Sequence, residues 1–186
     1  MAGSGSGRGE VRRQVILAAA MAIVAREGAG ALTHRAVAAE AGVSLASTTY
    51  HFAGIDDLRR TTFEWAADEI GSGFEGALAK AQSSTEPLNA VTEQWARVLA
   101  EHRAAFTAVL EMLIAAGRDP ELRRVAEDLL TRPAQLLAFA GFEDPPALVA
   151  ELIGLALVHL IEVHSDVGDF SRRALELIRR HAAEGD

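Results

Sequence analysis

Side chains that form hydrogen bonds gather in one stretch near the amino terminus, where residues 33–52 read THRAVAAEAGVSLASTTYHF. The second half of this stretch carries three hydroxyl groups and two longer donors: Ser47, Thr48, Thr49, Tyr50 and His51. Hydroxyls bond phosphates and base edges with little discrimination, and the two longer side chains suit phosphate. Such a surface suits nucleic acid better than a protein core, so we interpret the stretch as a candidate nucleic-acid interface.

Three positions near these donors could distinguish one base from another. Leu45 and Ala46 offer only apolar contact, for which a thymine methyl group is the natural partner in the major groove. Arg35 precedes them, and its forked guanidinium is the best candidate for bidentate reading of a guanine.

Two short helices joined by a tight turn would position these side chains. Thr33 is placed to cap the first helix, and Gly42 can end it because glycine enters the left-handed conformation without a Cβ penalty. Ser44 then caps a second helix, about Leu45 to His51. This is a helix-turn-helix pattern, although an ordinary corner between two helices would show the same turn. The polar second helix and the surrounding chain favour the DNA-binding reading.

Around this corner the sequence resembles the TetR family of bacterial repressors. The resemblance covers Arg12 to Leu58 and rests on an ordered set of positions: Arg12-Arg13, Ile16-Leu17, Ala19-Ala20, Gly28, Leu32-Thr33, Ala41-Gly42-Val43-Ser44, Tyr50-His51-Phe52 and Asp56-Asp57-Leu58. The remaining two thirds of the chain has no diagnostic motif, as expected if that part of the family varies with its ligand.

The resemblance also implies roles for single residues. It implies phosphate contacts at Thr33, Ser47, Tyr50 and His51 and base contacts at Arg35, Leu45, Ala46 and Thr49, and Ser44 completes the predicted DNA-binding set. Many relatives carry other residue types at Leu45, Ala46 and Thr48-Thr49, so the identity of the bases does not carry over. Ile55 replaces a common lysine, and we expect one phosphate contact to be missing there.

Length and composition indicate a globular chain. Its 186 residues, 49% of them hydrophobic, suffice for one or two domains with a sizeable core. The absence of cysteine excludes disulfides and thiolate metal sites and suits a reducing cytoplasm, where we expect the protein. The longest apolar run, Leu152–Ile161, is about half the length of a membrane span. Residues 1–9 are rich in Gly and Ser and predict a flexible tail without a secretion signal.

Charge is divided unevenly along the chain. The net charge is −8, yet residues 1–53 hold five basic and three acidic residues, a balance of +2. The other 13 basic and 23 acidic residues give the rest of the chain −10. Nucleic acid would therefore be attracted to the amino-terminal face and repelled elsewhere.

Apolar residues recur at helical spacing along the whole chain, and no alternating strand pattern occurs. We predict an all-α fold of nine or ten helices. After the tail, residues 10–54 would form a three-helix, helix-turn-helix DNA-binding domain. Residues 55–186 would form a helical bundle for ligand binding and dimerisation, beginning with a long helix from Ile55 to about Lys80.

Motifs for other chemistry are weak. Gly71 to Gly76 matches GxGxxG, but no strand precedes it, and we interpret it as a weakened or kinked part of a helix. His159 and His164 lie five positions apart and point to different helix faces, so no metal site is predicted. No catalytic triad, phosphate loop or paired-carboxylate motif occurs, and the sequence predicts neither an enzyme nor a cofactor.

The middle helices carry side chains that could line a small-molecule cavity: Trp65, Phe74, Trp95, His102, Phe106 and Met112, with Glu111 as a second polar candidate. Any single one of them is better explained as core, so the cavity rests on the family resemblance. A later helix is apolar on more than one face, at Leu148, Leu152, Leu155, Ala156, His159, Leu160 and Val163. Either that helix is central to the core or two copies pair there, and the resemblance favours a two-fold, four-helix interface.

These observations predict a homodimeric repressor that binds a palindromic operator in double-stranded DNA and is released by a small-molecule effector. The alternative is a DNA-binding regulator without an effector, whose middle helices form a solid core. A cavity, or thermal stabilisation by small molecules, would discriminate between the two.

Overall fold

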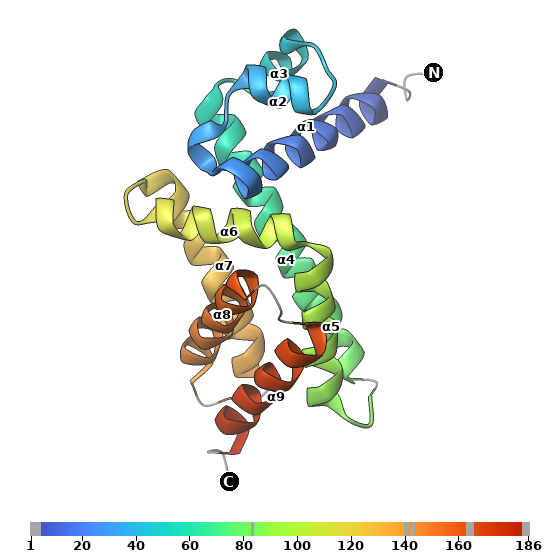
Figure 1. Ribbon diagram of the computed structural model, residues 1–186, viewed down its shortest axis with the longest axis vertical. Helices are drawn as coiled ribbons and strands as arrows, with labels where there is room; N and C mark the ends of the chain where they lie inside the picture. Colours follow the sequence, from blue (N-terminus) through green and yellow to red (C-terminus); the bar gives the residue numbers. More distant parts are fainter. Residues whose placement is uncertain (1–4, 83, 140–141, 143, 163–165, 184–186) are drawn as a thin grey trace. The chain divides into compact units, whose positions relative to one another are not determined.

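The computed structural model describes residues 5–82, 84–139, 142, 144–162 and 166–183. Over these residues the chain forms nine α-helices and one short 3-10 helix, with no strand (Figure 1). In order they are α1 (Gly5–Glu27), η1 (Ala29–Ala31), α2 (His34–Glu40), α3 (Leu45–His51), α4 (Ile55–Gln82), α5 (Pro87–Glu101), α6 (Arg103–Ala116), α7 (Pro120–Phe139), α8 (Pro145–Ile161) and α9 (Val167–Ala183). The predicted all-α fold is confirmed.

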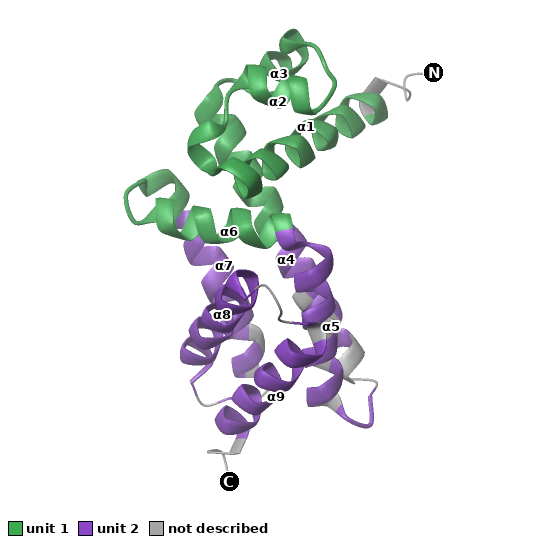
Figure 2. Cartoon of the chain, in the orientation of Figure 1, with its two compact units in different colours: residues 1–67, 104–123 green, residues 68–103, 124–186 purple. Residues whose placement is uncertain are grey.

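The described chain divides into two compact units (Figure 2). Unit 1 comprises the residues up to Ala67 together with Ala104–Arg123, and unit 2 comprises Asp68–Arg103 and the residues from Arg124 onward. Unit 1 therefore contains α1 to α3, the first part of α4 and nearly all of α6. It is larger than the DNA-binding domain expected at residues 10–54, and the functional boundary at residue 54 stays a prediction.

Unit 1 is built around α1, which buries one side of its length. Ile16, Leu17, Ala20, Ile23 and Val24 are all at most 2% exposed. The flexible tail expected at residues 1–9 is wrong in part, because α1 already begins at Gly5. Extending a helix by one residue costs far less than starting one, so a stable helix can recruit even a Gly/Ser-rich neighbour.

Unit 2 packs α9 against α5 and α8. The ring of Phe170 on α9 lies between two others, 6.1 Å from Trp95 on α5 and 5.1 Å from His159 on α8. Burial of these large rings, together with Leu99 and Leu148, is the main source of stability here, because stability scales with the apolar area removed from water.

The glycine run in α4 has a packing role in unit 2. A Cβ atom on Gly73 would lie 2.5 Å from Val98 Cγ1, so α4 and α5 approach as closely as they do only because residue 73 has no side chain. The run is helical, as expected, and lies in the interior of α4.

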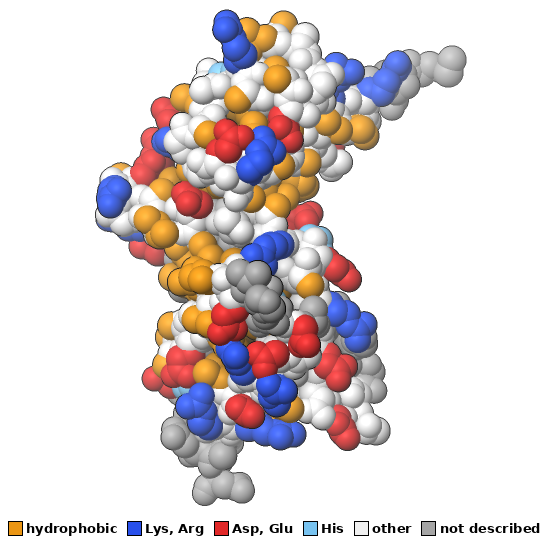
Figure 3. Space-filling view, in the orientation of Figure 1, with side chains coloured by type: hydrophobic (Ala, Val, Ile, Leu, Met, Phe, Trp, Pro, Cys, Tyr) orange, Lys and Arg blue, Asp and Glu red, His pale blue; other side chains and the backbone are white. Residues whose placement is uncertain are grey.

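The surface of unit 2 in the view of Figure 3 carries basic and acidic side chains interspersed. None of the described helices combines the length and the apolar composition that crossing a membrane requires.

Candidate nucleic-acid interface

Helices α2 and α3 follow one another around a tight corner (Figure 1). Side-chain caps hold the start of each helix. Thr33 Oγ1 accepts a hydrogen bond from the Ala36 N–H at 3.0 Å, and Ser44 Oγ accepts one from the Ser47 N–H at 3.2 Å. Between them Gly42 adopts a φ of +63°, in the left-handed region that favours glycine. The predicted caps and the glycine turn are confirmed, and they give α3 a defined direction relative to α2.

The outer surface of α3 faces solvent. Tyr50 is 85% exposed and Leu45 is 47% exposed, although apolar and aromatic side chains of this size usually avoid water. Of the nine predicted DNA-binding residues, seven are exposed (Thr33, Arg35, Ser44, Leu45, Ala46, Thr49 and Tyr50) and two are partly exposed (Ser47 and His51). The set is therefore accessible as a whole, and its contacts with DNA stay a prediction.

The hydroxyl groups of this region are in different states. Thr33 and Ser44 use their oxygens as acceptors, which leaves both hydroxyl protons for another partner. Thr48 is fully buried and donates to the Leu45 carbonyl at 2.8 Å, so it braces α3 and is not a surface hydroxyl as its sequence position suggested. Thr49 is exposed, yet it donates to the carbonyls of Leu45 and Ala46 at 3.3 and 3.2 Å.

Arginines around the corner also differ in their surroundings. Arg26 at the end of α1 is held by Glu27 at 2.8 Å and by Glu40 at 3.1 Å. Arg35 is exposed on α2, where it is accessible to a binding partner. Arg13 lies 5.5 Å over the ring of Phe52, a cation–π contact that ties α1 to the end of α3 and that spacing in the sequence did not indicate.

The residues predicted to line a ligand cavity are divided between the two units. Trp65, Phe106 and Met112 belong to unit 1, where the last two are buried, while Trp95 and His102 belong to unit 2. The side chain of Phe74 lies outside the described part of the chain. Trp95 packs on Phe170, and His102 Nδ1 lies 3.0 Å from Glu69 Oε2. Both contacts are explained by packing and pairing between helices without any ligand, and a shared cavity stays a prediction.

Unit 1 contains a pocket that the sequence did not indicate, where the start of α4 meets the start of α7. It measures about 450 Å³ and is lined by Asp56, Arg59, Arg60, Asp119, Pro120, Glu121 and Leu122, none of which is a predicted ligand-binding residue. Arg59 crosses it, pairing with Asp56 at 2.8 Å and with Asp119 at 3.5 Å. Its charged lining differs from the aromatic cavity that was expected, and such ion pairs are hard to foresee from residues sixty positions apart.

Helix α8 buries one apolar face and exposes the other. Four residues of the predicted dimer interface, Leu148, Leu152, Ala156 and His159, are buried within a single chain. Leu155 and Leu160 are partly exposed, and Val163 lies outside the described residues. The exposed apolar side chains are instead Leu157, Val158 and Ile161, at 43%, 43% and 69%. The four buried residues are thus unavailable to a second copy, and α9 packs against this helix within the same chain.

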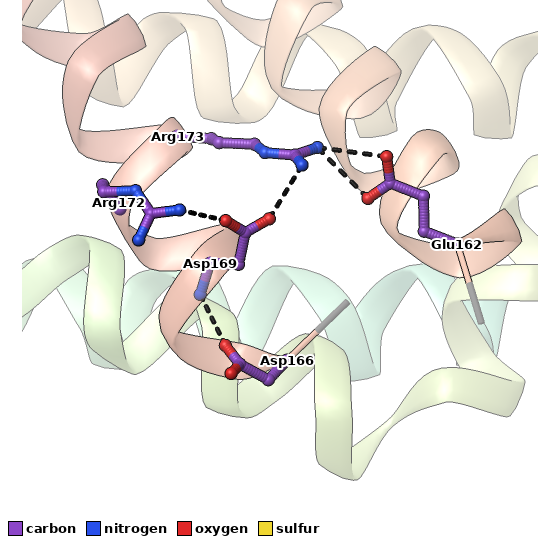
Figure 4. Close-up of polar contacts among 5 residues, drawn as sticks. All are labelled: Glu162, Asp166, Asp169, Arg172 and Arg173. Atoms are coloured by element: carbon purple, nitrogen blue, oxygen red, sulfur yellow. Dashed lines mark hydrogen bonds and ion pairs between the residues drawn. The ribbon is translucent and has the colours of Figure 1, made fainter. Parts of the chain in front are cut away.

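The end of α8 is joined to α9 by charge (Figure 4). Arg173 on α9 bridges Glu162 at 3.1 Å and Asp169 at 2.9 Å, while Arg172 pairs with Asp169.

The histidine on α8 lies in an environment that disfavours its charged form. Burial lowers the pKa of His159 below its ordinary 6.5, and the charge of Arg103 lowers it further. No group of three or more histidine or acidic side chains in the described ranges is arranged to hold a metal ion, and His164 lies outside those ranges.

A capped two-helix corner with an exposed outer helix, set in an all-helical chain, defines a helix-turn-helix protein. Residues 16–61 match the family of bacterial regulatory proteins called the tetR family. A solved structure described as a member of the TetR family, from Streptomyces coelicolor A3, is 31% identical, with 89% of this chain and 97% of that chain covered and a TM-score of 0.64. The chain belongs to the TetR family.

Other relatives are described as a multidrug binding protein and as transcriptional regulators. The multidrug binding protein EbrR, solved in complex with ethidium, is 35% identical over 91% of this chain and 97% of that chain, with a TM-score of 0.66. The HTH-type transcriptional regulator CymR of Pseudomonas putida is 28% identical over 108 residues, 58% of this chain. The HTH-type transcriptional dual regulator CecR of Shigella flexneri is 39% identical over 67 residues, 36% of this chain.

The match to this chain spans 52% of the length of CymR and 30% of the length of CecR, so the chain corresponds to only part of each regulator. The family and the two regulators are proteins of transcription regulation and not enzymes.

Proposed function

We propose that this protein is a sequence-specific transcriptional repressor that binds a palindromic operator as a homodimer and is released by a small-molecule effector. The observation that carries the proposal is the exposed outer surface of α3, held in direction by the caps at Thr33 and Ser44. In proteins of this class the second helix of the corner enters the major groove, and its first residues contact base edges.

The homodimer is supported by the exposed stripe on α8. Leu157, Val158 and Ile161 lie on one side of that helix and face solvent in the single chain. Pairing two copies there would remove an apolar patch from water, and a two-fold axis would present two copies of α3 to one side of a duplex. The half-sites of a palindromic operator would then lie roughly 34–36 Å apart.

The DNA-binding part is tested by selecting bound fragments from random duplexes. We expect a common palindromic sequence, against which Arg35→Ala loses about 1–3 kcal/mol of binding free energy and relaxes selectivity at one base pair. The matched control is Arg97→Ala, which removes another exposed arginine from α5. Recovery of no common sequence would refute the proposal, and equal weakening on every sequence would make Arg35 a phosphate contact.

The dimer is tested by placing a charge on its proposed surface. Ile161→Glu should convert dimers to monomers in multi-angle light scattering. Ile114→Glu is the control, because Ile114 on α6 has nearly the same exposure, 68% against 69%. A dimer that survives Ile161→Glu would contradict the α8 interface.

The effector class is proposed from EbrR, whose complexes with ethidium and proflavin have been solved. We propose planar aromatic cations of that kind, acting on DNA binding through α4, which runs from unit 1 into unit 2. A ligand changes operator affinity only if it binds the two states of the protein differently.

The cytoplasmic location of the protein stays a prediction.

Because both dyes also bind DNA, binding is measured first on the protein alone, as a rise in Tm. Compounds that raise Tm are then assayed for release of the operator, with an unrelated DNA-binding protein on its own site as the control. Selective release would support the effector. A raised Tm with unchanged operator affinity, or no rise with either dye, would favour a regulator without an effector of this class.

A further inference from the structure

We propose that α3 reads its operator through the C5 methyl groups of thymines, by apolar contact, and not through hydrogen bonds to base edges. This inference rests on the proposed DNA-binding function and adds the chemical group that is recognised. In the major groove the thymine methyl is the one apolar feature of the base edges, and alanine and the threonine methyl are suitable partners for it.

The first turn of α3 presents an apolar surface. Leu45 is 47% exposed and Ala46 is also exposed, at the positions that contact bases when such a helix enters the groove. Neither side chain has a donor or an acceptor. The residues of α3 include no acidic, amide, lysine or arginine side chain, so the bidentate pairings that usually identify guanine or adenine are absent from this helix.

The threonines on α3 do not replace those pairings. Thr48 is completely buried, with its hydroxyl bonded to the Leu45 carbonyl. Thr49 is exposed, but its hydroxyl is turned back onto the carbonyls of Leu45 and Ala46, both within 3.3 Å. A threonine whose hydroxyl is bonded to its own helix offers its methyl group to an outside partner. Thr49 therefore extends the apolar surface begun by Leu45 and Ala46.

The discriminating measurement replaces single thymines of the selected operator by uracil. This change removes one methyl group and leaves base pairing and the O4 acceptor intact. For each half-site we expect at least one thymine whose replacement weakens binding roughly four-fold, the effect of exposing one buried methyl group. Uracil at thymines outside the half-sites serves as the control and should leave the affinity unchanged.

A pair of substitutions at Thr49 identifies the protein partner. Thr49→Ser removes the methyl and keeps the hydroxyl, whereas Thr49→Val keeps the methyl and replaces the hydroxyl by a second methyl. We expect Thr49→Ser to weaken operator binding more than Thr49→Val and to lose sensitivity to uracil at one position. Thr131→Ser on α7 is the matched control, because Thr131 is exposed and donates to the Glu127 carbonyl at 2.8 Å in the same manner.

The outcomes separate this inference from the function on which it rests. A common operator whose affinity is insensitive to uracil at every thymine, or a larger loss with Thr49→Val than with Thr49→Ser, would overturn methyl readout and leave DNA binding standing. Failure to select any common duplex would overturn the proposed function and methyl readout with it. Thermal unfolding of each variant shows that lost binding is not lost folding.

Discussion

The helix-turn-helix corner in unit 1 and the bundle of α5, α8 and α9 in unit 2 hold their helices in different ways. In the corner, polar atoms only three positions away along the chain satisfy the helix starts, as between Thr33 and Ala36. In the bundle the joining contacts span long stretches of chain, such as the edge-to-face contact of Trp95 and Phe170. Local contacts define a direction for α3, whereas distant contacts define a packed interior.

The two regions also expose apolar surface for different reasons. In the corner, Leu45 is exposed on a helix whose other side is pinned by Thr48. In the bundle, Ile161 is exposed because only one face of α8 is covered. We therefore expect the stability of the corner to depend most on its helix caps and the stability of the bundle to depend most on side-chain packing. Substitutions in each region test this distinction.

The largest effect is expected from Gly73→Ala on α4, where that helix contacts Val98 on α5 of the bundle. The new Cβ would lie 2.5 Å from Val98 Cγ1, 2.8 Å from Cγ2 and 3.3 Å from Cβ, so rotating the valine gives no relief. We expect a loss of about 1–3 kcal/mol in the free energy of unfolding, measured by urea denaturation. Gly76→Ala is the control, because nothing lies within 4 Å of its new Cβ, and it should stabilise α4 by up to about 1 kcal/mol. Equal effects of the two changes would contradict the close approach of α4 and α5.

A smaller loss is expected from removing a cap in the corner. Ser44→Ala deletes the acceptor for the Ser47 N–H and should cost about 1 kcal/mol. Hydrogen exchange should show the opening confined to α3, while the amides of α9 keep their protection. Ser44→Asp supplies another capping oxygen and should restore most of the protection. Protection of α3 that survives Ser44→Ala would mean that packing and not the cap orders this helix.

A pH-dependent change is expected next in size, from His159. Since burial lowers its folded pKa below 6.5, the unfolded chain binds the proton more readily than the folded chain. The free energy of unfolding should therefore fall as the pH drops from about 7 through 6.5, and the loss should level off below the folded pKa. Urea titrations at several pH values measure this slope. His159→Phe, which keeps a ring against Phe170, should reduce it, and an unchanged slope would assign the dependence to other groups.

The smallest effect is expected at the charged end of the bundle. Arg173→Met breaks the bridge from Asp169 to Glu162, two partly exposed pairs whose contribution is about 0.2–1 kcal/mol and is screened by salt. Arg172→Met is the control, because Arg172 pairs only with Asp169 among the contacts drawn in Figure 4. The difference between the two variants should shrink in high salt, and a loss as large as that of Gly73→Ala would contradict a packing-dominated bundle.

Sequence reasoning was most successful where structure depends on near neighbours. The capping roles of Thr33 and Ser44 and the turn at Gly42 follow from residue types within a few positions, and the structure confirms them. It was least successful where a residue's surroundings depend on the rest of the fold. Thr48 has the same side chain as Thr49 but is buried. On α8, Leu148, Leu152 and Ala156 are buried whereas Leu157, Val158 and Ile161 are exposed.

The sequence by itself determined an all-helical chain, the helix-turn-helix corner and membership of its family, because helix periodicity, caps and glycine turns are encoded by local residue types. Only the tertiary structure decided which face of α8 remains open, which hydroxyls of α3 are occupied and why Gly73 must be glycine. Burial and close approach are properties of two surfaces together, and periodicity identifies an apolar face without specifying what packs against it.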